Sequence, residues 1–222
     1  TGIDIPANVV SIGVNAFSGM DNLQEFNVDP SNPSYYTEDG CLYTSQNVLL
    51  GVPAGKTFEN DTFVVPEGKT IAAYVFNGCN NIKVLDMSKI EMDVLPSYTF
   101  THFHSAEKII LPDVLTEIGS YAFRNCGSLK EVVIPDGVVK IGNYAFQNCT
   151  SLEDFTMKYT EGMNLGTYLF TGSGLSSVTI EEGYEIIPAY MFQDCKNLES
   201  VNLPSTLTLI SQYAFQNCTS LE

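Results

Sequence analysis

A repeat of about 23 residues runs through this chain and constrains its fold more than any other feature. The unit is clearest in the segment LKEVVIPDGVVKIGNYAFQNCTS, which begins at Leu129 and centres on a Tyr-Ala-Phe triplet. Equivalent phenylalanines follow one another at intervals of 59, 24, 23, 23, 24, 22 and 23 residues. They are Phe17, Phe76, Phe100, Phe123, Phe146, Phe170, Phe192 and Phe215. A fixed period between about 20 and 50 residues is typical of a solenoid.

Each unit predicts one short strand followed by a compact return. Leu129, Val132 and Ile134 form a β-branched run with intervening outward residues, and Pro135 ends the strand. The apolar positions that follow are too closely spaced for a full helix, so we predict a turn and one helical or 3₁₀ turn around NYAFQNC. Stacked coils of this kind bury shared columns of side chains, which predicts a strand-rich α/β solenoid.

The repeat is interrupted once, at about residues 31–60. Two strand-like runs lie inside the interruption, at residues 41–44 and 48–52, with turn residues between and around them. This pattern predicts a β-hairpin inserted between coils. We expect residues 1–222 to form a single solenoid domain that includes this insertion.

The pattern LxxVxIPxxVxxIxxxAFxxCxxL resembles the BspA-like leucine-rich repeats of bacterial surface proteins. The inserted segment, with NPxYxxxDGxLY before a leucine run and PAGK, is similar to the hairpin that such proteins place between coils. The resemblance implies a right-handed leucine-rich-repeat superhelix with one parallel sheet. It also implies an extracellular or bacterial cell-surface location, and adhesion to or recognition of a host or neighbouring-cell protein.

Charge and hydropathy exclude several classes of function. The formal net charge of −16 is spread along the chain and repels nucleic acid and anionic membranes, so neither is expected as a partner. No apolar run approaches the roughly 18 residues of a membrane span. Because the sequence stops within a repeat unit and lacks polar caps, we expect a fragment of a longer protein.

The cysteines and histidines predict no metal site. Five of the six cysteines share one repeat position, three residues after the phenylalanine, so we expect buried free thiols in a core column. His102 and His104 form the one His-x-His pair, but no further ligands lie nearby in the sequence. We therefore expect loop histidines and no bound cofactor.

No catalytic motif is present. The sequence contains no GxSxG, P-loop, GxGxxG or HExxH, and its carboxylates occupy positions that vary between units. We predict that the protein is not an enzyme.

The outward residues of the predicted sheet are the best candidate for a binding surface. Alternation along each strand sends two residues per unit to solvent, and these vary from unit to unit. An apolar centre with a polar rim is typical of protein interfaces. The candidate face comprises Val84, Asp86, Lys108, Ile110, Glu131, Val133, Asp154 and Thr156.

Other interpretations remain open from the sequence alone. The outward valines and isoleucine also suit strand propensity, and a passive stalk that presents another domain would carry the same repeat. A carbohydrate-binding accessory is a third possibility, because tyrosines recur two residues before the phenylalanines. That tyrosine hardly varies, with Asn15 in its place in the first unit, and this favours a structural column.

Overall fold

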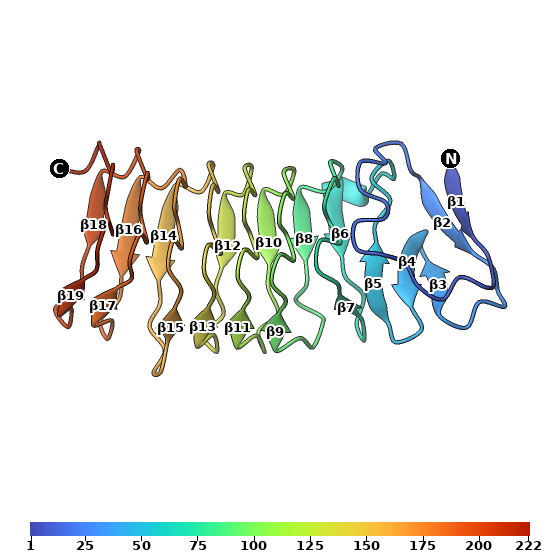
Figure 1. Cartoon of the computed structure of the whole chain (residues 1–222), viewed down its shortest axis with the longest axis horizontal. Coiled ribbons are helices and arrows are strands. Elements are labelled where there is room, and N and C mark those ends of the chain that lie inside the picture. Colours follow the sequence, from blue (N-terminus) through green and yellow to red (C-terminus); the bar gives the residue numbers. More distant parts are fainter.

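A computed structural model describes all residues from 1 to 222. The chain winds into a β-solenoid whose coils stack along the long axis, with the two termini at opposite ends (Figure 1). Paired residues of neighbouring coils lie 23 positions apart in the regular part, as in the pairing of Lys108 with Glu131. Each regular coil contributes one strand to each of two faces, so the expected stack of small coils is present.

The first face consists of parallel strands of three or four residues. In them an inward apolar residue stands between two outward ones, as Ile109 does between Lys108 and Ile110. The strands are β6 (Thr62–Val64), β8 (Val84–Asp86), β10 (Lys108–Ile110), β12 (Glu131–Val133), β14 (Asp154–Met157), β16 (Ser177–Ile180) and β18 (Ser200–Asn202). The strands β6, β8, β10 and β12 form one hydrogen-bonded sheet, and β14, β16 and β18 form another.

The second face also carries parallel strands, which corrects the expectation of one parallel sheet. The residues expected to form the return arc pair instead with the next coil, as Ile118 does with Ile141. The strands are β7 (Thr70–Ile71), β9 (Val94–Leu95), β11 (Glu117–Ile118), β13 (Lys140–Ile141), β15 (Asn164–Leu165), β17 (Ile186–Ile187) and β19 (Leu209–Ile210). Strands of two residues are too short for alternation to reveal them in the sequence.

The predicted helical turn around the Tyr-Ala-Phe triplet is wrong, and with it the α/β class. The tyrosine of every such unit has a positive φ, for example 58° at Tyr144, which a right-handed helix excludes. The segment instead forms successive tight turns whose alternate N–H groups bond to the next coil, as Phe123 N does to Ala145 O at 2.8 Å. The one helix is the 3₁₀ turn η1 (Glu59–Asp61), and no helix has the length and hydropathy of a membrane span.

A small antiparallel sheet fills the interruption in the repeat. It consists of β3 (Tyr35–Glu38), β4 (Cys41–Thr44) and β5 (Val48–Gly51), and β5 then pairs in parallel with β7. The two runs expected to form a hairpin are β4 and β5, and β3 extends them. Beyond this sheet β1 (Gly2–Ile5) pairs in parallel with β2 (Glu25–Val28) at the N-terminal end (Figure 1). The handedness of the superhelix stays a prediction.

Stacked side chains make up the interior. A continuous core of 48 buried residues runs from the insertion to the last coil, and its central column is the repeated phenylalanine. Phe123 and Phe146 stack with their ring centroids 4.8 Å apart and 9° between their planes. A parallel stack of tyrosines lies two residues before this column, in which Tyr168 and Tyr190 approach to 4.2 Å. Each coil therefore buries its apolar groups only against its neighbours.

The cysteine column lies in this core, as the sequence predicts. Each of its thiols also donates a hydrogen bond to a backbone carbonyl of the coil before it, as Cys149 Sγ does to Phe123 O at 3.2 Å. Burial raises the pKa of Cys149 to about 12 because the thiolate would be desolvated. Cys218, in the last coil, is only partly covered, and burial raises its pKa to about 11.

Close contact between coils makes Gly142 sensitive to substitution. A β-carbon there would lie 2.5 Å from the backbone nitrogen of Ser120 in the preceding coil. We expect Gly142→Ala to lower the free energy of unfolding by about 1–3 kcal/mol, because the coils must move apart. Gly127→Ala is the matched control, since its nearest neighbour would be at 3.5 Å, and it should change stability by less than about 0.5 kcal/mol. Equal losses in urea unfolding would contradict this account of the spacing.

The raised thiol pKa values predict a pH-dependent pattern of alkylation. Because the pKa is raised, the buried thiols stay protonated as pH rises past their ordinary value of 9.0, and the protonated form is a poor nucleophile. We expect iodoacetamide at about pH 8.5 to leave Cys126 and Cys149 unmodified in the folded protein and to modify all cysteines in concentrated urea. Cys218 should react first as the pH rises, because it is the one cysteine that is only partly buried. Peptide mass spectrometry measures each site, and rapid alkylation of Cys149 in the folded state would contradict the prediction.

Candidate functional site

Six of the eight candidate residues lie together on the outer side of the first face. Parallel pairing places Val84, Lys108 and Glu131 side by side in one row across β8, β10 and β12. The same pairing forms a second row from Asp86, Ile110 and Val133. The register is the one that the 23-residue repeat requires.

The two rows differ in how far their apolar residues project. Val133 is 61% exposed, whereas Val84 and Ile110 are half-buried. Val64, which stands beside Asp86 on β6, is also exposed. The apolar centre expected from the sequence is therefore dominated by one projecting side chain, Val133, with Ile110 beside it.

The charged residues of this face are held by near neighbours. Lys108 Nζ lies 2.7 Å from Glu131 Oε1, and this half-exposed ion pair joins β10 to β12. Asp86 accepts a hydrogen bond from the backbone N–H of Ser88 at 2.8 Å. Exposed pairs of this kind contribute about 0–1 kcal/mol to stability, so their main effect is to orient the side chains.

Asp154 and Thr156 are separated from the other six residues by a break in hydrogen bonding. They begin the sheet formed by β14, β16 and β18, and β12 is the last strand of the sheet before it. Asp154 accepts a hydrogen bond from Ser177 Oγ at 2.5 Å, so its carboxylate is turned toward its own sheet. The candidate face therefore consists of two parts that meet between β12 and β14.

Shallow hollows lie on both sides of Val133. One, of about 260 Å³, is bordered by Lys108, Ile110 and Glu131 together with Asp113 and Pro135. The other, of about 270 Å³, lies at the break and is bordered by Val132, Asp154, Thr156, Phe155 and Lys158. Sequence reasoning missed Asp113, Pro135, Val132, Phe155 and Lys158, because each belongs to a loop or to a position expected to face inward.

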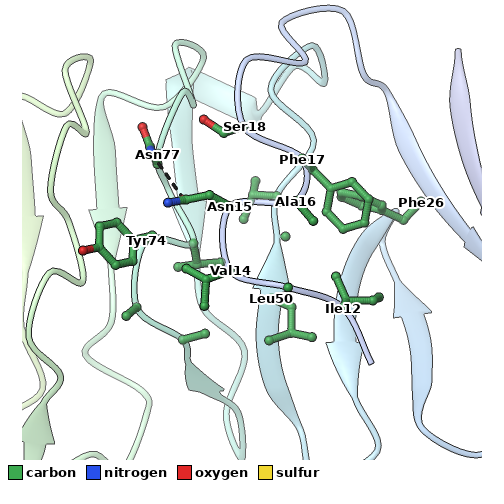
Figure 2. Close-up of a pocket in the computed structure, with 16 residues that line it drawn as sticks. Ile12, Val14, Asn15, Ala16, Phe17, Ser18, Phe26, Leu50, Tyr74 and Asn77 are labelled. Atoms are coloured by element: carbon green, nitrogen blue, oxygen red, sulfur yellow. Dashed lines mark hydrogen bonds between the residues drawn. The ribbon is translucent and has the colours of Figure 1, made fainter. Parts of the chain in front are cut away.

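A more enclosed cavity lies where the N-terminal unit meets the solenoid (Figure 2). It measures about 90 Å³ and lies between residues 12–18 and residues 72–77, with Leu50 and Phe26 also in its lining. Asn77 Nδ2 donates a hydrogen bond to Asn15 Oδ1 at 3.3 Å across this junction, and Phe17 packs against Phe26 (Figure 2). A volume this far below the roughly 300–1,000 Å³ of ligand pockets marks imperfect packing at the junction.

The histidine pair occupies a turn at the edge of the solenoid. The rings of His102 and His104 are 5.5 Å apart, and His102 Nδ1 lies 3.3 Å from Asn125 Nδ2. Burial is the main cause that lowers the pKa of His102, with the neighbouring charge of His104 next. No cluster of three or more histidine, cysteine, aspartate or glutamate side chains is placed to hold a metal ion.

On the first face, the exposed side chains and the two shallow hollows form a surface that is suited to binding.

Comparisons with known proteins agree with the repeat and with the fold. A family model described as the BspA type leucine-rich repeat region matches residues 1–52, 69–163 and 116–222, with six copies. A search of curated proteins finds no match.

Solved bacterial structures share the fold. A leucine-rich repeat protein from Bacteroides ovatus is 22% identical with a TM-score of 0.64, and the match covers 100% of this chain and 65% of that one. The Treponema pallidum leucine-rich repeat protein is 24% identical with a TM-score of 0.61, covering 87% and 90% of the two chains. The pneumococcal vaccine antigen PcpA is 20% identical with a TM-score of 0.55, and this chain spans only 51% of its length. With repeats matched over nearly its whole length, the chain belongs to the BspA-type leucine-rich repeat family.

Proposed function

We propose that this chain is a non-catalytic interaction module, located outside or on the surface of a bacterial cell, whose first face binds a protein of a host or neighbouring cell. The observation that carries the proposal is the exposed Val133 between two hollows, with the Lys108–Glu131 ion pair beside it. An accessible apolar residue within a polar surround is a common centre of a protein interface.

The family and the names of two structural neighbours support the location. One structural neighbour is named as a vaccine antigen, and another, 24% identical with a TM-score of 0.51, as a leucine-rich cell surface protein from Faecalibacterium prausnitzii. The matching family is a repeat family, and the linings of the hollows on this face contain no serine, cysteine or histidine that could form a nucleophile–base pair. Binding is the function that such a surface supports.

The test is adhesion of beads coated with the protein to cultured epithelial cells. We expect the double variant Ile110→Glu/Val133→Glu to lose at least about 90% of the wild-type adhesion, because two carboxylates would be desolvated at the centre of the interface. The matched control is Val94→Glu, which changes an exposed valine of β9 on the second face and should leave adhesion unchanged. Circular dichroism on all three proteins checks that the fold is retained.

Treatment of the cells separates this function from its alternatives. Protease treatment of the cell surface should abolish adhesion if the partner is a protein, whereas glycosidase treatment should leave it intact. Adhesion removed by glycosidases alone would favour a carbohydrate-binding accessory. Wild-type beads that fail to adhere to any cell would favour a passive stalk.

A further inference from the structure

The second face is interrupted where a proline replaces a hydrogen-bond donor. At a regular junction the residue after each short strand donates its N–H to the preceding coil, as Gly166 does to Ile141 O at 2.8 Å. The same bond recurs from Gly119 to Leu95, from Gly142 to Ile118 and from Ser211 to Ile187. Pro188 occupies this position after β17 and has no N–H, so the carbonyl of Leu165 lacks that donor. β15 and β17 accordingly belong to separate sheets.

A hollow of about 780 Å³ lies at this interruption, between β15 and β17. Its volume is within the roughly 300–1,000 Å³ typical of binding pockets. Met163, Leu165 and the 49%-exposed Ile186 supply apolar surface, and Tyr159 stands beside them. The coils separate only locally, because Tyr168 and Tyr190 remain stacked at 4.2 Å elsewhere in the same two coils.

The backbone on both sides of the hollow is suited to an extended peptide. β15 pairs only with β13, and β17 pairs only with β19, so one edge of each strand faces the hollow without a ladder partner. Unpaired strand edges are templates for another chain, and addition of a peptide to such an edge is a common mode of recognition. The apolar side chains of the lining then supply contacts for alternate residues of the peptide.

The charge around the hollow selects the peptide's side chains. Glu185 lines the hollow, and Glu161, Glu181 and Glu182 adjoin its lining residues Gly162 and Gly183 in the sequence. None of these carboxylates takes part in a salt bridge, but Glu181 accepts a hydrogen bond from the backbone N–H of Tyr159, and Glu182 accepts from Ser205. Lys158, the lysine of the same unit, is paired with Asp136 at 2.6 Å. Uncompensated negative charge attracts cationic partners and raises their rate of association.

A second proline, at the equivalent position of another coil, shows which of these features distinguish the hollow beside Pro188. Pro96 follows β9 as Pro188 follows β17, and β7 and β9 also belong to separate sheets. The hollow there measures about 390 Å³, but its lining has no apolar side chain and contains two lysines with two glutamates. The loss of a ladder bond thus occurs twice, whereas apolar surface and net negative charge are combined with it only at Pro188.

We propose that the hollow between β15 and β17 binds an extended segment of a protein partner in which apolar residues alternate with lysine or arginine. The segment pairs through its backbone with the open edge of β15 or β17. Its apolar side chains lie on the inward side and contact Leu165, and its cationic side chains lie on the outward side with Ile186, near the surrounding carboxylates. This site lies on the second face and does not depend on the function proposed for the first.

The experiment uses the whole chain labelled with ¹⁵N and a capped nonapeptide of alternating valine and lysine as the probe. We expect saturable shifts of the amide resonances of Leu165 and Ile186, with Thr70 at the Pro96 hollow unchanged. Glu185→Lys should weaken binding at least about fivefold, because an attraction becomes a repulsion. Glu199→Lys makes the same change of net charge at an exposed position outside the hollow and should alter affinity less than about twofold.

Other outcomes overturn the proposal. Shifts spread evenly over acidic surfaces, or equal weakening by Glu199→Lys, would mean that only the overall charge attracts the peptide. Equal binding of a valine–serine nonapeptide would remove the requirement for cationic residues. Shifts at Leu165 and Ile186 with an oligosaccharide of N-acetylglucosamine, but with neither peptide, would assign the hollow to glycans. The measurement on the unsubstituted protein stands even if Glu185→Lys impairs folding.

Discussion

Each coil makes turn hydrogen bonds of its own, but its short strands and many of its turn N–H groups can complete their hydrogen bonds only with the coils next to it. Of 112 backbone hydrogen bonds, 29 lie within helices and strands, and the other 83 are made by turns and loops, within a coil or to a neighbouring coil. A buried N–H or C=O without a partner is costly, and this requirement fixes the distance and register of neighbouring coils. Equivalent side chains must then stand above one another, which is why the sequence repeats in columns. The outward rows form where this register is kept. The open strand edges and the hollows beside them form where pairing between neighbouring coils is lost.

The same constraint explains the unusual backbone at the tyrosine stack. A left-handed conformation costs a non-glycine residue roughly 1–2 kcal/mol, yet every repeated tyrosine adopts it. The conformation directs alternate N–H groups to the next coil and aligns the phenol rings in a stack whose planes differ by 5° between Tyr121 and Tyr144. Aromatic contact and inter-coil bonding together offset the strain. A second left-handed residue follows each phenylalanine by two positions, and there the sequence uses Asn, Asp, Gly or His, which tolerate it best.

The sequence was sufficient for the columns and for the outward rows because both follow from simple periods. A spacing of 23 aligns Lys108 with Glu131, and alternation along three residues assigns Ile109 to the core. The absence of helix was not predictable from apolar spacing, because a positive φ at Tyr144 leaves no mark in hydropathy. The hollows beside Val133 depend on the distance between neighbouring coils, and many contacts together determine that distance. The lack of a backbone N–H at Pro188 could be read from the sequence. Its consequence could not, because the two-residue strands of the second face were not predicted.

One coil has a broken ladder on both of its faces, and this has a consequence for binding. The coil that holds β14 and β15 loses its ladder to the preceding coil on the first face and its ladder to the following coil on the second. Its phenylalanine and tyrosine stacks continue in both directions. The ring centroid of Phe170 lies 5.3 Å from that of Phe146 and 5.6 Å from that of Phe192. The interior therefore holds the coil in place while both outer faces open, so recognition surfaces can change there without disrupting the core. In a fold stabilised by nearest-neighbour contacts, the cost of such a defect stays local. A broken ladder that leaves the core columns intact is thus compatible with stability and gives this part of the stack distinctive surfaces.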